Sequence, residues 1–213
     1  WSAAIWPRVS ARLWRRAAVR ELAPSGGAVI LDLCAGSGDV ALLLARRSRA
    51  RVIGADFSAA MLEAARGKAK RAGVPLPLVR ADAMALPFRS GSLDGITVAF
   101  GVRNFEDLDA GLREMARTLK PGGRAVILEF SQPRGSLFGH LYLFYLRRVL
   151  PLVGRLISGR PGAYAYLPAT VAVFPGPEGV SRRLEQAGLA PVATSRLTAG
   201  AVMLYVAEAR ARA

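Results

Sequence analysis

The stretch VILDLCAGSGD, residues 29–39, decides the fold of this chain. It begins with an apolar run of the length of a buried strand and continues into a glycine-rich turn, after which a helical pattern starts. Further strand and helix signals alternate along the chain, with strands expected at 51–55, 76–80, 94–100 and 124–130 and helices at 58–71 and 107–119. This alternation predicts an α/β fold whose doubly wound sheet is mostly parallel.

Two β-rich stretches, Pro191 to Leu197 and Ala201 to Ala207, are separated by only three residues. Such close spacing predicts a hairpin, so the sheet is expected to end with an antiparallel strand. Two other segments lie outside the alternation. Residues 1–22 superficially resemble a transit peptide, but we favour an amphipathic N-terminal helix lying on the domain. Residues 131–175 are expected to form a helical cap over a substrate.

Length and composition indicate one globular domain spanning residues 1–213, with 52% hydrophobic residues. The single cysteine, Cys34, excludes a disulfide framework and is expected to serve packing. The single histidine, His140, is expected to lie on the surface, and no metal site is expected. No run of 18 apolar residues occurs, so we expect a soluble, cytoplasmic protein.

The charge balance is strongly basic, because 30 lysines and arginines stand against 15 acidic residues and give a net charge of +15. Such a charge favours contact with nucleic acid or an anionic membrane, although the same excess can be spread over solvated faces. In the expected cap, Arg147 and Arg148 directly follow a broad apolar stripe within residues 137–146. We therefore expect peripheral contact with the cytoplasmic face of an anionic membrane.

The glycine turn at Gly36 and Gly38 lets a ligand approach the backbone closely, and the helix that follows points free N–H groups at it. Eighteen residues past Gly38, Asp56 ends the second strand, where a carboxylate can accept hydrogen bonds from both hydroxyls of a ribose. The same turn satisfies a loose dinucleotide fingerprint, Gly36-x-Gly38-x-x-Ala41, so a nicotinamide-dependent reductase remains open.

Three features favour S-adenosylmethionine as the ligand. Asp32 and Asp39 flank the turn with carboxylates, which suit a sulfonium and an ammonium and would repel a pyrophosphate. Asp82 and Ala83 follow the third strand, where the aspartate is placed to take the adenine amine. The terminal hairpin matches the antiparallel strand of class I methyltransferases, whose sheet is Rossmann-like.

Five segments then occur in order, FGVRN at 100–104, LKPGG at 119–123, LEFSQP at 128–133, YAYL at 164–167 and LTAG at 197–200. Through them the chain resembles the demethylmenaquinone methyltransferase family, the C-methyltransferases that complete menaquinone and ubiquinone. The resemblance covers roughly residues 26–206. LKPGG is common among methyltransferases, whereas FGVRN and LEFSQP together are specific.

The resemblance implies where the cofactor is held. Together with the turn residues, the expected S-adenosylmethionine contacts are Asp32, Gly36, Ser37, Gly38, Asp56, Asp82, Ala83 and Ala99. Similar enzymes often have a serine where Ala99 stands, so one side-chain hydrogen bond is expected to be missing here. The family's upstream Tyr-Asp segment has no counterpart in residues 1–20, which leaves the general base unassigned.

The resemblance also implies methyl transfer to a ring carbon of a prenylated quinol, with demethylmenaquinol to menaquinol as the expected reaction. Arg103 is expected to stabilise a phenolate and Asn104 to orient a hydroxyl. If Arg103 has no catalytic role, we expect it to form a salt bridge to Glu106 or Asp107 at the start of the helix. Substrate contacts are expected from the aromatic residues Phe100, Tyr142, Tyr145 and Tyr166.

Other functions stay open at this point, namely methylation of another small molecule, methylation of nucleic acid, and ligand binding without catalysis. Nucleic-acid enzymes that methylate amino groups usually carry Asn/Asp-Pro-Pro-Tyr/Phe after the fourth strand. This chain has AFGV at residues 99–102, so nucleic acid is not expected as a partner. The type of quinol ring, the length of the prenyl tail and assembly as a homodimer are left open.

Overall fold

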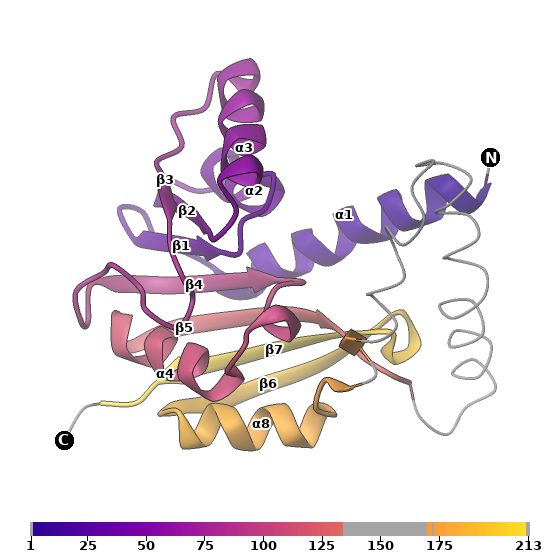
Figure 1. Cartoon of the computed structure of the whole chain (residues 1–213), viewed down its shortest axis with the longest axis vertical. Helices are drawn as coiled ribbons and strands as arrows, with labels where there is room; N and C mark the ends of the chain where they lie inside the picture. The colour runs from indigo at the N-terminus through magenta and orange to yellow at the C-terminus, as the bar shows by residue number, and fades with distance from the viewer. Residues whose placement is uncertain (1, 134–169, 172, 212–213) are drawn as a thin grey trace.

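The computed structural model describes residues 2–133, 170–171 and 173–211, and the strands there form one sheet in the order β3-β2-β1-β4-β5-β7-β6 (Figure 1). They are β1 (Val29–Leu33), β2 (Arg51–Asp56), β3 (Leu78–Arg80), β4 (Leu93–Ala99), β5 (Leu119–Phe130), β6 (Leu189–Leu197) and β7 (Val202–Ala209). β1 to β5 pair in parallel, whereas β7 runs antiparallel to β5 and β6. The predicted parallel sheet with an antiparallel C-terminal strand is confirmed.

Helices cover both faces of this sheet. The described helices are α1 (Ser2–Leu22), α2 (Asp39–Arg47), α3 (Ala59–Ala72), α4 (Leu108–Thr118) and α8 (Pro177–Gln186), with short 3₁₀ turns η1 (Val102–Asn104) and η3 (Thr198–Gly200). In β5, Ala125 and Ile127 pack into the core that contains α4 and α8, whereas Val126 and Leu128 pack into the core that contains α1 and α2. Successive side chains of a strand point to opposite faces, so an unbroken apolar run is what a doubly covered strand requires.

Side-chain caps fix the starts of two helices at the predicted places. Ser58 accepts a hydrogen bond from the backbone N–H of Met61 at 3.4 Å, and Asp107 accepts one from Ala110 at 2.9 Å. Both caps satisfy a backbone N–H that the first turn of a helix leaves without a partner. The sequence therefore determines where α3 and α4 begin.

The LKPGG segment behaves differently from the simple turn that the sequence predicts. β5 begins at Leu119, which pairs with Leu93, and the next pairing joins Arg124 to Gly95. The intervening residues of β5 bulge out of register with β4, and Gly122 takes a φ of 74°. The residues that predict a turn thus form a bulge within a longer strand.

The N-terminal helix α1 packs against β4 and β5 (Figure 1). Ala18, Val19 and Leu22 are buried in its contact with the sheet. Two hydrogen bonds also fasten α1 to later parts of the chain. The indole Nε1 of Trp14 donates to Thr198 Oγ1 at 2.9 Å, and an Nη1 of Arg124 donates to the carbonyl of Glu21 at 3.0 Å.

Most of the expected cap, residues 131–175, lies outside the described residues. The expected substrate contacts Tyr142, Tyr145 and Tyr166 therefore have no structural account here, nor do His140 and the arginines at 147 and 148. Among the helices that the structure does describe, none combines the length and the apolar character that crossing a membrane requires.

Candidate active site

A cleft of about 600 Å³ opens where β1, β2 and β4 end, which is where ligands bind in open parallel sheets. The sequence-predicted residues that line it are Asp32, Gly36, Ser37, Asp56, Asp82, Ala83, Ala99, Phe100, Arg103 and Asn104. Gly38 stands just outside this lining. It precedes α2 with a φ of 81°, and a Cβ there would lie 3.1 Å from the Cβ of Ala65. A glycine is required at this position because of the positive φ of the turn and because α3 packs closely against it.

Asp56 fastens the glycine turn to the end of β2. Its Oδ2 accepts from the backbone N–H of Gly36 at 2.8 Å, and its Oδ1 accepts from that of Ser58 at 2.9 Å. An ionised carboxylate offers about four acceptor positions, so each oxygen keeps room for a ligand hydroxyl. Asp56 is thus already oriented, and it still has the capacity that binding a ribose needs.

Asp32 is buried, with 1% of its surface exposed, and both of its oxygens bond within the protein. Its Oδ2 accepts from the N–H of Ala41 and its Oδ1 from the hydroxyl of Thr97, each at 2.8 Å. Burial raises the pKa of this carboxyl from 3.8 to about 7, against the opposing effect of these bonds. A cation placed in the cleft would favour the ionised form.

Asp39 lines the cleft where the sequence predicts a carboxylate, and two cations already engage it. Lys68 Nζ donates to Asp39 Oδ1 and to Ser37 Oγ, both at 2.7 Å. An Nη1 of Arg15 lies 3.2 Å from the other oxygen, Oδ2. Sequence reasoning missed both cations because they come from α3 and α1, far from the turn along the chain.

Arg103 does not make the predicted alternative salt bridge to Glu106 or Asp107. Its Nη1 donates to Glu129 Oε1 at 2.6 Å and to the carbonyl of Phe100 at 2.7 Å. The two charged side chains are 5% and 0% exposed. Burial raises the pKa of Glu129, and the guanidinium of Arg103 opposes that rise.

Both hydrogen bonds described above for this buried guanidinium come from Nη1 and do not use its Nε. Among the described residues, Nε of Arg103 has no hydrogen-bond partner, although it is buried. Such a group is rare, because buried donors in folded proteins nearly always have a partner. Glu129, which holds Arg103, was not singled out from the sequence, although it belongs to the LEFSQP segment that was.

Strained backbone brings the ends of β1 and β4 together. Cys34 and Phe100 have φ values of 56° and 61°, which side chains other than glycine rarely adopt. At Gly101, a Cβ would lie 2.5 Å from the Cβ of Cys34, so only glycine fits there. Burial raises the pKa of the Cys34 thiol to about 12, so the thiol stays protonated at neutral pH and does not act as a nucleophile.

Aromatic rings form one wall beside the cleft. The ring of Phe100 lies 4.5 Å from that of Phe130 and 6.0 Å from that of Trp14, measured between centroids. The guanidinium of Arg103 lies 5.4 Å from the centroid of Phe130. This wall joins α1, β4 and β5, and it presents apolar surface next to a fixed positive charge.

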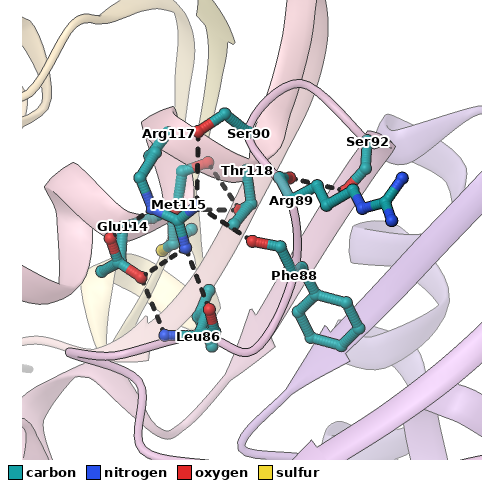
Figure 2. Close-up of polar contacts among 9 residues, drawn as sticks. All are labelled: Leu86, Phe88, Arg89, Ser90, Ser92, Glu114, Met115, Arg117 and Thr118. Carbon is teal, nitrogen blue, oxygen red and sulfur yellow. Dashed lines mark hydrogen bonds and ion pairs between the residues drawn. The ribbon is translucent and has the colours of Figure 1, made fainter.

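The loop after the expected adenine contact is held by α4 (Figure 2). Arg117 donates to the carbonyls of Leu86 and Phe88, each at 2.9 Å, while Glu114 accepts from the N–H of Leu86 at 2.8 Å. The bond from Arg117 also lowers the pKa of Glu114. Asp82, just upstream, accepts from the N–H of Met84 at 2.9 Å. The segment from β3 to β4 is thus anchored to α4.

Comparison with known families decides between the open alternatives. The sequence profile described as the ubiE/COQ5 methyltransferase family matches residues 8–208. This chain belongs to that family. A demethylmenaquinone methyltransferase of Thermus thermophilus is 46% identical, over 92% of this chain and 89% of its own length. The ubiquinone/menaquinone biosynthesis C-methyltransferase UbiE of Geobacter sulfurreducens is 44% identical, over 92% and 78% respectively.

Solved structures agree on the fold of this family member. A SAM-dependent methyltransferase from Aquifex aeolicus superposes with a TM-score of 0.67 at 17% identity, over 91% of this chain and 88% of that one. Haemonchus contortus phosphoethanolamine N-methyltransferase 2, in complex with S-adenosyl-L-methionine, gives 0.71 at 15% identity, over 92% and 52%. The chain therefore has the class I fold and is an S-adenosylmethionine-dependent methyltransferase. The nicotinamide reductase and the binding module without catalysis are set aside.

The residues of the cleft fit this cofactor. Asp56 keeps acceptor positions for a ribose, and Asp32 offers a carboxyl whose ionised form a sulfonium or an ammonium in the cleft would favour. In the described part of the chain, no group of three or more His, Cys, Asp or Glu side chains is arranged to hold a metal ion. The described cleft lining also contains two positive charges, those of Arg15 and Arg103, which the cofactor contacts named above do not use.

Proposed function

We propose that this methyltransferase acts on a ring carbon of a prenylated quinol, and that demethylmenaquinol, which becomes menaquinol, is its substrate. The observation that carries the proposal is the buried Arg103, held by Glu129 with its Nε unpartnered among the described residues. A fixed cation with a spare donor suits an oxygen that gains negative charge during the reaction. The names of the curated relatives, demethylmenaquinone methyltransferase and UbiE, support the same substrate class.

The chemistry explains why such a cation is needed. Bound S-adenosylmethionine supplies a methyl group, whose bond to sulfur breaks as a bond to the ring carbon forms, with S-adenosylhomocysteine and a ring proton as the other products. A ring carbon attacks in this way only when it is electron-rich, so the quinone must be in its reduced form. Loss of a proton from the neighbouring hydroxyl makes the carbon more nucleophilic and leaves a phenolate.

In this proposal each cleft residue has a role. Nε of Arg103 donates to the phenolate oxygen, and Asn104 orients the hydroxyl group beside it. Phe100 and Phe130 provide an apolar wall for the quinol ring. Asp56 binds the ribose of the cofactor and Asp82, with Ala83, its adenine, while Ser37 and Ala99 line the remaining surface. Holding both reactants at this geometry supplies much of the acceleration.

The proposal includes the cap and the membrane. The prenylated substrate is insoluble in water, and the apolar stripe at residues 137–146 with Arg147 and Arg148 behind it suits an anionic membrane surface. Co-sedimentation with anionic and neutral vesicles tests this for the Arg147→Glu/Arg148→Glu variant. The matched control is Arg46→Glu/Arg47→Glu, an exposed basic pair on α2 with the same change of charge. Loss of anionic binding in the first variant alone supports the cap, and equal binding of all three proteins contradicts it.

Transfer of a radiolabelled methyl group to defined acceptors tests the function itself. Reduced demethylmenaquinone is expected to gain one label on its ring carbon, whereas the oxidised quinone is expected to gain none, because only the reduced ring is electron-rich. A prenylated benzoquinol precursor, run in parallel, shows whether a second ring type is accepted. Absence of label in every prenylated quinol, with label in another small molecule or in nucleic acid, would overturn the proposal.

A further inference from the structure

The cleft contains a second positive charge that the proposed reaction does not use. Arg15 of α1 lines the cleft beside the glycine turn, with a 29% exposed side chain, and its guanidinium lies 3.2 Å from Asp39. Among the described residues that line the cleft, Arg15 and Arg103 are the cations. Arg103 is engaged by Glu129 and the Phe100 carbonyl and is already assigned to the methyl acceptor, so Arg15 is the cation left for the cofactor.

The cofactor needs a cation at this place. The methionine end of S-adenosylmethionine carries an ammonium and a carboxylate. The acidic residues lining the cleft are Asp32, Asp39, Asp56, Asp82 and Glu106. These acidic side chains suit the ammonium, but they repel a carboxylate unless a cation stands among them. A guanidinium has five N–H donors in a planar fork, which can bind a carboxylate through two bonds and still contact a second one.

The position of Arg15 is fixed by its own helix. It lies one turn before Ala18 and Val19 and two turns before Leu22, on the face of α1 that is buried against the sheet. Its neighbour Trp14 is bonded to Thr198, which sets the rotation of the helix about its axis. Arg16, by contrast, is exposed. The packing of α1 against the sheet thus brings Arg15 to the cleft.

We propose that Arg15 binds the α-carboxylate of S-adenosylmethionine, which makes α1 a part of the cofactor site. Asp39 positions the guanidinium from one side, and Lys68 holds Asp39 in place through its other oxygen. The assignment concerns the cofactor alone, so it does not depend on which molecule accepts the methyl group.

Binding of two ligands that differ at the methionine end tests the assignment. S-adenosylhomocysteine keeps the amino-acid group, whereas 5′-methylthioadenosine keeps the adenosine and the thioether without it. In Arg15→Gln, we expect the Kd of S-adenosylhomocysteine to rise by at least about tenfold, as loss of a charge-assisted bond implies. The Kd of 5′-methylthioadenosine is expected to stay within about twofold, since it carries no carboxylate. Isothermal titration calorimetry on the full chain measures both constants.

Two further variants make the result specific. Arg16→Gln removes the same charge from the exposed face of the same helix and is expected to leave both constants unchanged. Arg15→Lys keeps a cation and is expected to recover part of the affinity for S-adenosylhomocysteine. If Arg15→Gln weakens both ligands equally, Arg15 acts by packing α1. If it weakens neither, the carboxylate is bound elsewhere. Either result overturns the proposal.

Discussion

The guanidinium of Arg103 and the carboxylate of Glu129 lie 2.6 Å apart in the interior, beneath the cleft and between the ends of β4 and β5. Glu129 also accepts bonds from the backbone N–H groups of Arg103 and Phe130. Glu129 therefore holds the backbone of η1 and of β5 as well as a charged side chain. A buried charge that loses its partner is strongly unfavourable, because nothing else compensates its desolvation.

Structural and catalytic contributions of the pair can be separated by comparing single and double variants. Arg103→Ala leaves Glu129 uncompensated and is expected to lower the free energy of unfolding by about 3–5 kcal/mol. Methyl transfer is expected to fall by about 10²–10³, the size that loss of one preorganised donor has. The double variant Arg103→Leu/Glu129→Leu is expected to regain most of the stability and none of the activity. Urea unfolding and the methyl-transfer assay measure the two effects, and near-normal turnover in either variant would leave Arg103 with a structural role alone.

The raised pKa of Asp32 makes stability depend on pH. Burial raises this pKa from 3.8 to about 7, so between these values the folded protein binds more protons than the unfolded chain. The free energy of unfolding is then expected to fall as pH rises from about 4 to about 7, by at most about 1.4 kcal/mol per pH unit from this group. Asp32→Asn cannot titrate. Its stability relative to the natural protein is therefore expected to improve over this interval.

Urea unfolding of both proteins at several pH values between 4 and 7.5 measures this difference. Asp94→Asn is a useful control, because the bond from Lys120 lowers the pKa of Asp94. For that variant the loss of stability is expected to stay nearly constant over this interval, because the contribution of Asp94 is lost only as pH falls below the ordinary aspartate range. A constant offset between Asp32→Asn and the natural protein at every pH would contradict the buried-carboxyl explanation.

Asp56→Ala is expected to weaken cofactor binding by about 2–4 kcal/mol, because it removes both ribose acceptors and releases the N–H of Gly36 from its partner. Unlike Arg15→Gln, it should weaken S-adenosylhomocysteine and 5′-methylthioadenosine to the same extent, since both ligands carry the ribose. Calorimetric titration gives the two constants. Unchanged affinity for both ligands would show that the adenosyl group is bound elsewhere.

The bond between Trp14 and Thr198 joins α1 to η3, between β6 and β7. Trp14→Phe keeps an aromatic ring beside Phe100 and Phe130 but removes the donor, and Thr198→Ala removes the acceptor. A double-mutant cycle is expected to give a coupling energy of about 0.5–1.5 kcal/mol from unfolding measurements. A coupling energy of zero would mean that the packing of α1 does not depend on this contact.

Much of the fold follows from local signals in the sequence. The apolar run of β1, the cap at Ser58 and the cap at Asp107 each depend on residues within a few positions of one another. The meeting of Gly36 and Asp56 in the cleft was also predictable, because the carboxyl ends of neighbouring parallel strands must meet.

The rest depends on packing between distant segments, which local patterns do not encode. Arg15 reaches the cleft because α1 crosses β4 and β5, and the pattern of α1 predicts a buried face without saying what that face covers. Glu129 looked like an ordinary strand residue until its pairing with Arg103 was known. The two cationic partners of Asp39 were not predictable, because they come from other helices.

The order of strands has a consequence for how the protein is made. β7 follows β6 in the chain but lies between β6 and β5 in the sheet. While a ribosome is still producing residues 202–209, β6 has no strand beside it and the edge of β5 is open. An open edge on an apolar strand is a site for wrong pairing. The nascent chain therefore exposes an unpaired strand edge, to which chaperones can bind, until β7 is made. β7 then pairs with β5 and β6 at the same time.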